Sequence, residues 1–258
     1  MLAAVNTIMN RREWAMLVTL SVLWGGSFFF AEIALESLPP LTIVTLRVGL
    51  AAITLWLVVL ALKLPIPNSP PIWIAFFTMG LLNNVLPFSL IVWGQSQISS
   101  GLAAILNATA PLFGVIVAGI LLRDESATPL KITGVVIGFA GVIVMMDLSS
   151  IATSGLLAQL AILAAALSYA CASVYGRRFK ATGLNPILVA AGQVSGSTLL
   201  LLPIALWVDG NDHYANVPSQ VWAAIISLAV FSTAAAYILY FKLLASAGAT
   251  NILLVTLL

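Results

Sequence analysis

Long apolar runs joined by short polar connections dominate this sequence. A helix needs about 20 predominantly apolar residues to cross the hydrocarbon core of a bilayer. No stretch shows the apolar–polar alternation that is typical of barrel strands. The pattern therefore predicts an all-α polytopic membrane protein. We expect its spans near residues 14–31, 41–62, 72–92, 99–122, 130–146, 155–176, 185–207 and 221–240, and a ninth that begins near residue 249 and is cut off at residue 258.

The composition agrees with this class and excludes several functions. Hydrophobic residues make up 62% of the 258 residues and charged residues 7%, whereas about a quarter of the residues of a soluble domain are charged. A single cysteine, Cys171, and a single histidine, His213, exclude an internal disulfide and a cysteine or histidine metal cluster. The sequence has no phosphate-binding P-loop and no grouping of a nucleophile with a base. We expect no metal, no cofactor and no nucleic-acid partner.

The charges predict the orientation of the spans. If the N-terminus lies inside, nine of the ten basic residues fall on the inner side, and the tenth is Arg47. Positive charge gathers on the cytoplasmic side of membrane proteins. We therefore expect a bacterial inner-membrane protein with a cytoplasmic N-terminus. The inner side would hold Arg11, Arg12, Lys63, Arg123, Lys131, Arg177, Arg178, Lys180 and Lys242, and the outer side Glu32, Glu36, Asp147, Asp209 and Asp212.

An internal repeat relates the two halves of the chain. SLIVWGQSQISSGLAAIL (residues 89–106) aligns with AYILYFKLLASAGATNIL (residues 236–253), 147 residues further on. Arg47 aligns with Gln193 at an offset of 146 residues. Each unit would hold five spans, so the second would enter the membrane the opposite way up, as in secondary transporters whose site lies between the halves. We expect a first unit at residues 1–147 and a second, incomplete one at residues 148–258.

Three stretches carry a family resemblance. SVLWGGSFFFAEIALESLPPLTIVTLRV (residues 21–48), SSGLAAILNATAPLFGVIVAGILLRDE (residues 99–125) and TGVVIGFAGVIVM (residues 133–145) resemble the first half of an EamA-type transporter of the drug/metabolite transporter superfamily. The resemblance implies ten helices in two inverted five-helix repeats, here truncated in the ninth helix. It also implies a secondary transporter that exports small organic metabolites by alternating access, with amino acids, aromatic ones included, as the expected substrates.

Two prolines point to polar groups inside the spans. Pro87 and Pro111 cannot donate to the carbonyls four residues earlier, which belong to Asn83 and Asn107. Freed backbone groups at membrane depth are tolerated where neighbouring helices or a cavity satisfy them. We therefore regard Asn83, Asn107 and the adjacent Asn84 as candidates for a substrate cavity. The alternative is that these asparagines only bond across helix contacts.

A second group of cavity candidates is aromatic or polar. An apolar cavity with a few placed polar groups suits an amphipathic metabolite. Trp24 precedes two glycines, so a tight helix crossing is the alternative explanation there. Tyr175 and Tyr240 are further possibilities. The main candidates are Trp24, Ser27, Tyr169, Gln193 and Tyr237.

Arg47 lies inside an apolar span, about six residues from its outer start and hence about 9 Å deep. An arginine at the centre of a span costs about 2.5–3.5 kcal/mol on insertion scales. Two roles are open. It could form an ion pair with Glu32 or Glu36 that joins the first two helices, or it could anchor a substrate carboxylate. A guanidinium suits both, because its fork binds a carboxylate bidentately.

The main functional hypothesis is a transporter of amino acids or similar metabolites that works as a monomer among membrane lipids. One alternative is a multidrug or other metabolite exporter of the same superfamily. A proton-coupled drug exporter would need a deep carboxylate, and none lies deep in any expected span. A remote alternative is an intramembrane enzyme, for which the sequence offers no catalytic constellation.

Overall fold

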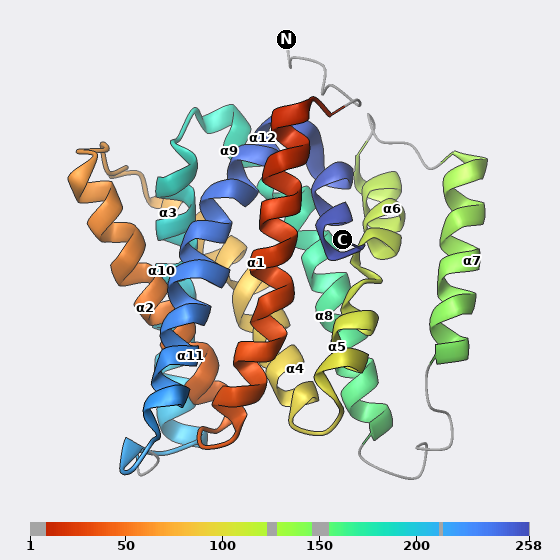
Figure 1. Ribbon diagram of the computed structural model, residues 1–258. Coiled ribbons are helices and arrows are strands. Elements are labelled where there is room, and N and C mark those ends of the chain that lie inside the picture. The colour runs from red at the N-terminus through yellow and green to blue at the C-terminus, as the bar shows by residue number, and fades with distance from the viewer. Residues whose placement is uncertain (1–8, 123–127, 146–154, 212–213, 258) are drawn as a thin grey trace.

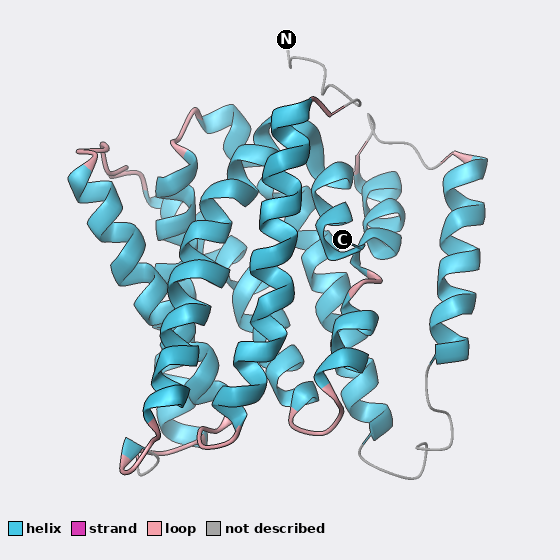
Figure 2. Ribbon diagram, viewed as in Figure 1, coloured by secondary structure: helices cyan, strands magenta, loops and turns pink. Residues whose placement is uncertain are grey.

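The computed structural model describes residues 9–122, 128–145, 155–211 and 214–257, and every regular element in them is a helix (Figure 2). The N-terminal half contains α1 (Arg11–Leu35), α2 (Pro40–Ala61), α3 (Pro70–Gly80), the π-helical segment η1 (Leu81–Val85), α4 (Leu86–Gln95), α5 (Ser100–Asn107), α6 (Ala110–Leu121) and α7 (Pro129–Met145). The C-terminal half contains α8 (Gly155–Gly176), α9 (Arg178–Thr182), α10 (Pro186–Val208), α11 (Ser219–Ala229), the π-helical segment η4 (Val230–Ala235), α12 (Ala236–Leu253) and the short 3-10 segment η5 (Leu254–Leu257).

These helices form a bundle whose connections lie at its two ends (Figure 1). Seven helical stretches of the described chain are long and apolar enough to cross a membrane, and a shorter apolar helix covers Pro129–Val144. Each of the first eight expected spans coincides with one of these helical stretches, which confirms the polytopic all-α class. The protein is therefore an integral membrane protein.

Three of the long helical stretches are interrupted near their middle. In the third stretch η1 ends two residues before Pro87, and the freed carbonyl of Asn83 lies 3.2 Å from the hydroxyl of Tyr237, which is a donor for it. In the fourth stretch α5 ends at Asn107, and α6 begins three residues later with Pro111 near its start. The last stretch has η4 between α11 and α12, although no proline follows it.

The structure corrects our prediction that a separate ninth helix begins near residue 249. We expected a break between residues 240 and 249, but α12 is helical from Ala236 to Leu253. In the first half the equivalent turn has a cap, because the Ser99 side chain accepts from the backbone N–H of Leu102. The second half has an alanine-rich stretch there, and alanine is the strongest helix former. The C-terminus of the described chain lies beside α1 and α6 (Figure 1).

α10 packs closely against α2 and α3. A Cβ added to Gly80 of α3 would lie 2.5 Å from the carbonyl oxygen of Gln193, and one added to Gly196 would lie 3.0 Å from the Phe77 Cα atom. Small residues at helix crossings in membrane proteins allow backbones to approach in this way. This contact fixes η1, which follows Gly80, against α10.

Charged residues separate toward the two ends of the bundle. The start of α1, the α2–α3 connection with Lys63, and α9 with Lys180 lie at one end (Figure 1). The α1–α2 connection with Glu36 lies at the other, where Asp209 accepts from the Thr42 N–H at 2.7 Å. This hydrogen bond joins the start of α2 to the end of α10. The expected positions of Arg123, Asp147, Asp212 and His213 lie outside the described residues.

Candidate functional site

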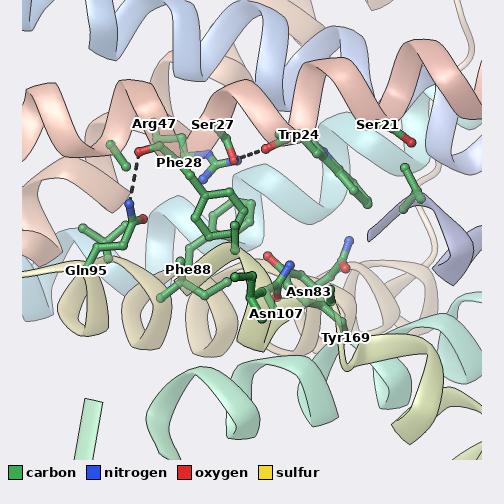
Figure 3. Close-up of a pocket in the computed structure, with 18 of the residues that line it drawn as sticks. Ser21, Trp24, Ser27, Phe28, Arg47, Asn83, Phe88, Gln95, Asn107 and Tyr169 are labelled. Atoms are coloured by element: carbon green, nitrogen blue, oxygen red, sulfur yellow. Dashed lines mark hydrogen bonds between the residues drawn. The ribbon is translucent and has the colours of Figure 1, made fainter. Parts of the chain in front are cut away.

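A cavity of about 330 Å³ lies among α1, α4 and α5, with further lining residues from α2, η1, α8, α12 and η5 (Figure 3). It extends from the interrupted middle of the bundle toward the end that holds the α1–α2 and α4–α5 connections, because Ala31 and Gln95 lie near the ends of their helices. Its polar and aromatic lining residues include Trp24, Ser27, Phe28, Arg47, Asn83, Phe88, Gln95, Asn107, Tyr169 and Tyr240.

Six of the cavity candidates from the sequence line this cavity, as does Arg47: Trp24, Ser27, Asn83, Asn107, Tyr169 and Tyr240. Trp24 packs against Tyr240, with ring centroids 5.6 Å apart, and so contributes to an aromatic wall. Next to it, a Cβ added to Gly25 would meet no atom within 4 Å. The alternative explanation, a tight crossing of α1 at Gly25, therefore does not hold.

Asn84, Gln193 and Tyr237 do not line the cavity but form a buried network behind it. The Tyr237 hydroxyl contacts Asn84 Oδ1, and Asn84 Nδ2 donates to Ser197 Oγ at 2.7 Å. Asn83 Nδ2 lies 3.3 Å from Gln193 Oε1. These bonds connect η1 to both α10 and α12. Asn83 thus takes part both in the cavity lining and in the cross-helix bonding that we had treated as alternatives.

Arg47 projects into the bundle and not toward the acidic end of α1. Its Nε donates to Thr233 Oγ1 at 2.8 Å, and its Nη2 lies 3.4 Å from the Ser232 carbonyl oxygen, both in η4. Its Cζ atom lies 3.7 Å from the centre of the Phe88 ring. The guanidinium therefore joins α2 of the first half to the π-helical segment of the second half.

This geometry corrects the expected ion pair of Arg47 with Glu32 or Glu36. The Glu32 side chain is exposed on α1, and Glu36 Oε2 lies 3.3 Å from Gln220 Nε2. Neither carboxylate contacts Arg47 in the structure. The reason is that Arg47 lies on the face of α2 that packs into the bundle, where its side chain is 5% exposed.

The cavity also contains a polar atom without a protein partner. Asn107 is 8% exposed, and its Oδ1 has no hydrogen-bond donor among the described residues. An unsatisfied buried acceptor costs about 1–3 kcal/mol, and each one in a native protein requires an explanation. Because Asn107 lines the cavity, its oxygen can accept from a molecule that enters it.

Sequence reasoning missed several lining residues, notably Phe28, Phe88 and Gln95. Gln95 Nε2 donates to the Phe28 carbonyl at 3.0 Å and to Ser100 Oγ at 2.8 Å, which ties α1 to the α4–α5 turn. A glutamine at the end of an apolar run was a visible signal. The phenylalanines gave none, since in the sequence a lining phenylalanine looks the same as one that faces lipid.

Comparison with known proteins identifies the family. The model of the EamA-like transporter family matches residues 12–147 and 156–258. The chain belongs to the EamA-like transporter family. An EamA chain of this kind is a membrane transporter for a small-molecule substrate.

Individual relatives agree with this assignment. An uncharacterized transporter of Archaeoglobus fulgidus is 28% identical over 88% of this chain and 78% of its own length. The uncharacterized inner membrane transporter YedA of Escherichia coli strain K12 is 29% identical over 88% of this chain and 72% of its own length. A solved crystal structure aligns with this EamA chain at a TM-score of 0.69 and 18% identity, covering 96% of this chain and 86% of the other, and shows the same fold.

Proposed function

We propose that the protein is a secondary transporter that exports amino acids, and that the cavity of about 330 Å³ is its substrate site. Small-molecule sites typically have about 300–1,000 Å³, so this cavity suits a small metabolite. The observation that carries the proposal is the lining itself, which combines the cation of Arg47 and the amide of Asn107 with aromatic rings. An amino acid offers a matching carboxylate, ammonium and side chain.

Alternating access between two inverted units, residues 1–147 and 148–258, is part of the proposal. The two stretches matched by the family model support it. So does the presence of a π-helical segment in the third helical stretch of each half, η1 and η4. We further propose that the end with Lys63 faces the cytoplasm of a bacterium, because basic residues gather there. A functional monomer is also part of the proposal.

A multidrug exporter for cationic compounds is the second candidate, and the lining argues against it. The lining includes one arginine and no carboxylate in the described part of the chain. A cation entering this cavity would meet Arg47 without a compensating negative charge. An intramembrane enzyme has no support from the family.

Uptake by proteoliposomes tests the proposed function. Purified protein is reconstituted into liposomes. For each of the twenty amino acids, the proteoliposomes are loaded with the unlabelled form and the counterflow uptake of the labelled form is measured. Protein-free liposomes are the control. We expect saturable accumulation of at least one amino acid. Background uptake of every amino acid, together with uptake of apolar cations, would support the multidrug alternative instead.

A further inference from the structure

Arg47 lines the cavity and has unused hydrogen-bonding capacity. A guanidinium carries five N–H donors, and among the described residues only Nε and Nη2 of Arg47 have acceptors, Thr233 Oγ1 and the Ser232 carbonyl. Both acceptors are uncharged. The Phe88 ring covers one face of the guanidinium and orients its plane through a cation–π contact. The remaining N–H groups of the guanidinium have no acceptor among the described residues and can donate to a ligand.

No carboxylate of the described residues neutralises this buried cation. Glu13 Oε2 accepts from the Asn10 N–H at 2.9 Å in the cap of α1, and Asp209 accepts from Thr42. Glu32 and Glu36 are exposed. A buried charge is normally paired, so Arg47 favours an anion in the cavity. A carboxylate fits best, because the planar fork binds it bidentately.

Asn107 offers the complementary group in the same cavity. Its Oδ1 is a buried acceptor without a donor in the described part of the chain. Arg47 and Asn107 come from different helices, α2 and α5, and both line the cavity (Figure 3). The cavity thus presents a cationic donor and a neutral acceptor at two separate points. This combination suits a zwitterion, which has an anionic acceptor and a cationic donor.

We infer that Arg47 binds the carboxylate, and the Asn107 amide oxygen the ammonium, of one amino-acid substrate whose side chain packs on Trp24, Phe28 and Tyr240. The inference deepens the proposed function. Its ammonium part rests on that function, because it requires the substrate to be an amino acid. The carboxylate subsite does not depend on it, since Arg47 would also bind an organic acid without an amine. Arg47 is then a substrate-binding residue as well as a connection between α2 and η4.

Four ligands with one side chain separate the two subsites. These are phenylalanine, phenylalanine methyl ester (no carboxylate), 3-phenylpropionate (no ammonium) and phenethylamine (neither carboxylate nor ester). Their affinities are measured by ligand-induced thermal shift and isothermal titration on purified protein, for wild type, Arg47→Gln and Asn107→Leu. Lys63→Gln is the matched control, because it removes an equal charge from the α2–α3 connection, away from the cavity lining.

For wild type we expect phenylalanine to bind at least about tenfold more tightly than the ester or 3-phenylpropionate, since each analogue lacks one charged hydrogen bond. Arg47→Gln should weaken phenylalanine and 3-phenylpropionate about tenfold or more and leave the ester and phenethylamine unchanged. Asn107→Leu should weaken phenylalanine, the ester and phenethylamine and leave 3-phenylpropionate unchanged. Lys63→Gln should match wild type for all four ligands.

Equal weakening of all four ligands by Arg47→Gln, or no weakening of any, would overturn the carboxylate subsite and leave Arg47 a structural residue. If Arg47→Gln does not fold, Arg47→Lys replaces it, because it keeps the charge but loses the fork. It should then weaken the two carboxylate ligands selectively. If no amino acid is transported or bound but 3-phenylpropionate binds in an Arg47-dependent way, the proposed function fails while the carboxylate subsite stands.

Discussion

Asn84 and Asn107 are both buried amides near interrupted helices, but their surroundings differ. The Asn84 side chain contacts Tyr237 and Ser197, so both ends of its amide have partners within the bundle. The Asn107 oxygen has none among the described residues and lines the cavity. The first arrangement contributes to stability, whereas the second is available to a ligand. The same substitution at the two positions should therefore have opposite effects.

Asn107→Leu should reduce amino-acid transport about tenfold or more and leave the thermal stability unchanged or slightly higher, because it removes an unsatisfied buried polar atom. Transport by proteoliposomes and the melting temperature in detergent measure the two effects. Unchanged transport with a lower melting temperature would mean that Asn107 only serves helix packing.

Asn84→Leu should instead lower the melting temperature of the protein. It removes the hydrogen bonds that Asn84 makes with Ser197 and Tyr237, each worth about 0.5–1.5 kcal/mol, although both hydroxyls keep a backbone carbonyl as an acceptor. The comparison with Asn107→Leu controls for the change in side-chain shape. An Asn84→Leu protein as stable as wild type would show that this network contributes nothing to the fold.

Local sequence rules predicted some of the site residues, and long-range contacts account for those that they missed. The proline rule indicated Asn83 and Asn107 because a proline frees a carbonyl only four residues away. The partners of Arg47, in contrast, are Ser232 and Thr233, which lie in the other half of the chain. No property of the span around Arg47 indicates them, and the nearby acid Glu32 was therefore a wrong partner.

At the scale of the elements, the π-helical segments η1 and η4 have different causes. Pro87 follows η1 and explains why its helix cannot keep regular hydrogen bonds. In η4 the Thr233 hydroxyl donates to the Leu228 carbonyl five residues earlier, at 2.7 Å, and accepts from Arg47. The length of the apolar runs was enough to predict the helical stretches that contain η1 and η4. Only η1 had a signal in the sequence, which is Pro87. π-Bulges occur frequently at functional sites, and Asn83 of η1 lines the candidate cavity.

Gly80→Ala tests the packing that places η1. The added Cβ would lie 2.5 Å from the carbonyl oxygen of Gln193, which is backbone and cannot rotate away. Overpacking of this kind costs about 1–3 kcal/mol, so the yield of folded protein and its melting temperature should fall. Gly134→Ala in α7 is the matched control, because a Cβ there meets no atom within 4 Å. Equal stability of the two variants would contradict the close crossing of α3 and α10.

At the scale of the whole molecule, the bundle has one basic and one acidic end, and its cavity extends toward the acidic one. If the basic end is cytoplasmic, the structure has its cavity on the outer side of the middle. The aromatic contacts of Trp24 with Tyr240, Tyr240 with Phe241 and Phe241 with Phe179 continue from the cavity toward α9 at the basic end. This column of rings connects the cavity wall to α9.

Cysteine labelling tests the orientation. On a Cys171→Ala background, we expect Lys63→Cys to react with a membrane-impermeant maleimide only after the cells are permeabilised. Glu36→Cys, at the opposite end of the bundle, should react in intact cells. Labelling of position 63 in intact cells would reverse the orientation of the protein and the direction assigned to the cavity.

The central claim is that substrate passes through this cavity, and one pair of variants tests it most directly. Gly25 lines the cavity, and a leucine there would add four carbon atoms at the cavity wall without a clash at Cβ, whereas a leucine at Gly141 would lie on the exposed surface of α7, also without a clash. The measurement is counterflow of the transported amino acid by proteoliposomes that contain equal amounts of folded protein. The account predicts background counterflow for Gly25→Leu and wild-type counterflow for Gly141→Leu. Wild-type counterflow by Gly25→Leu would contradict it.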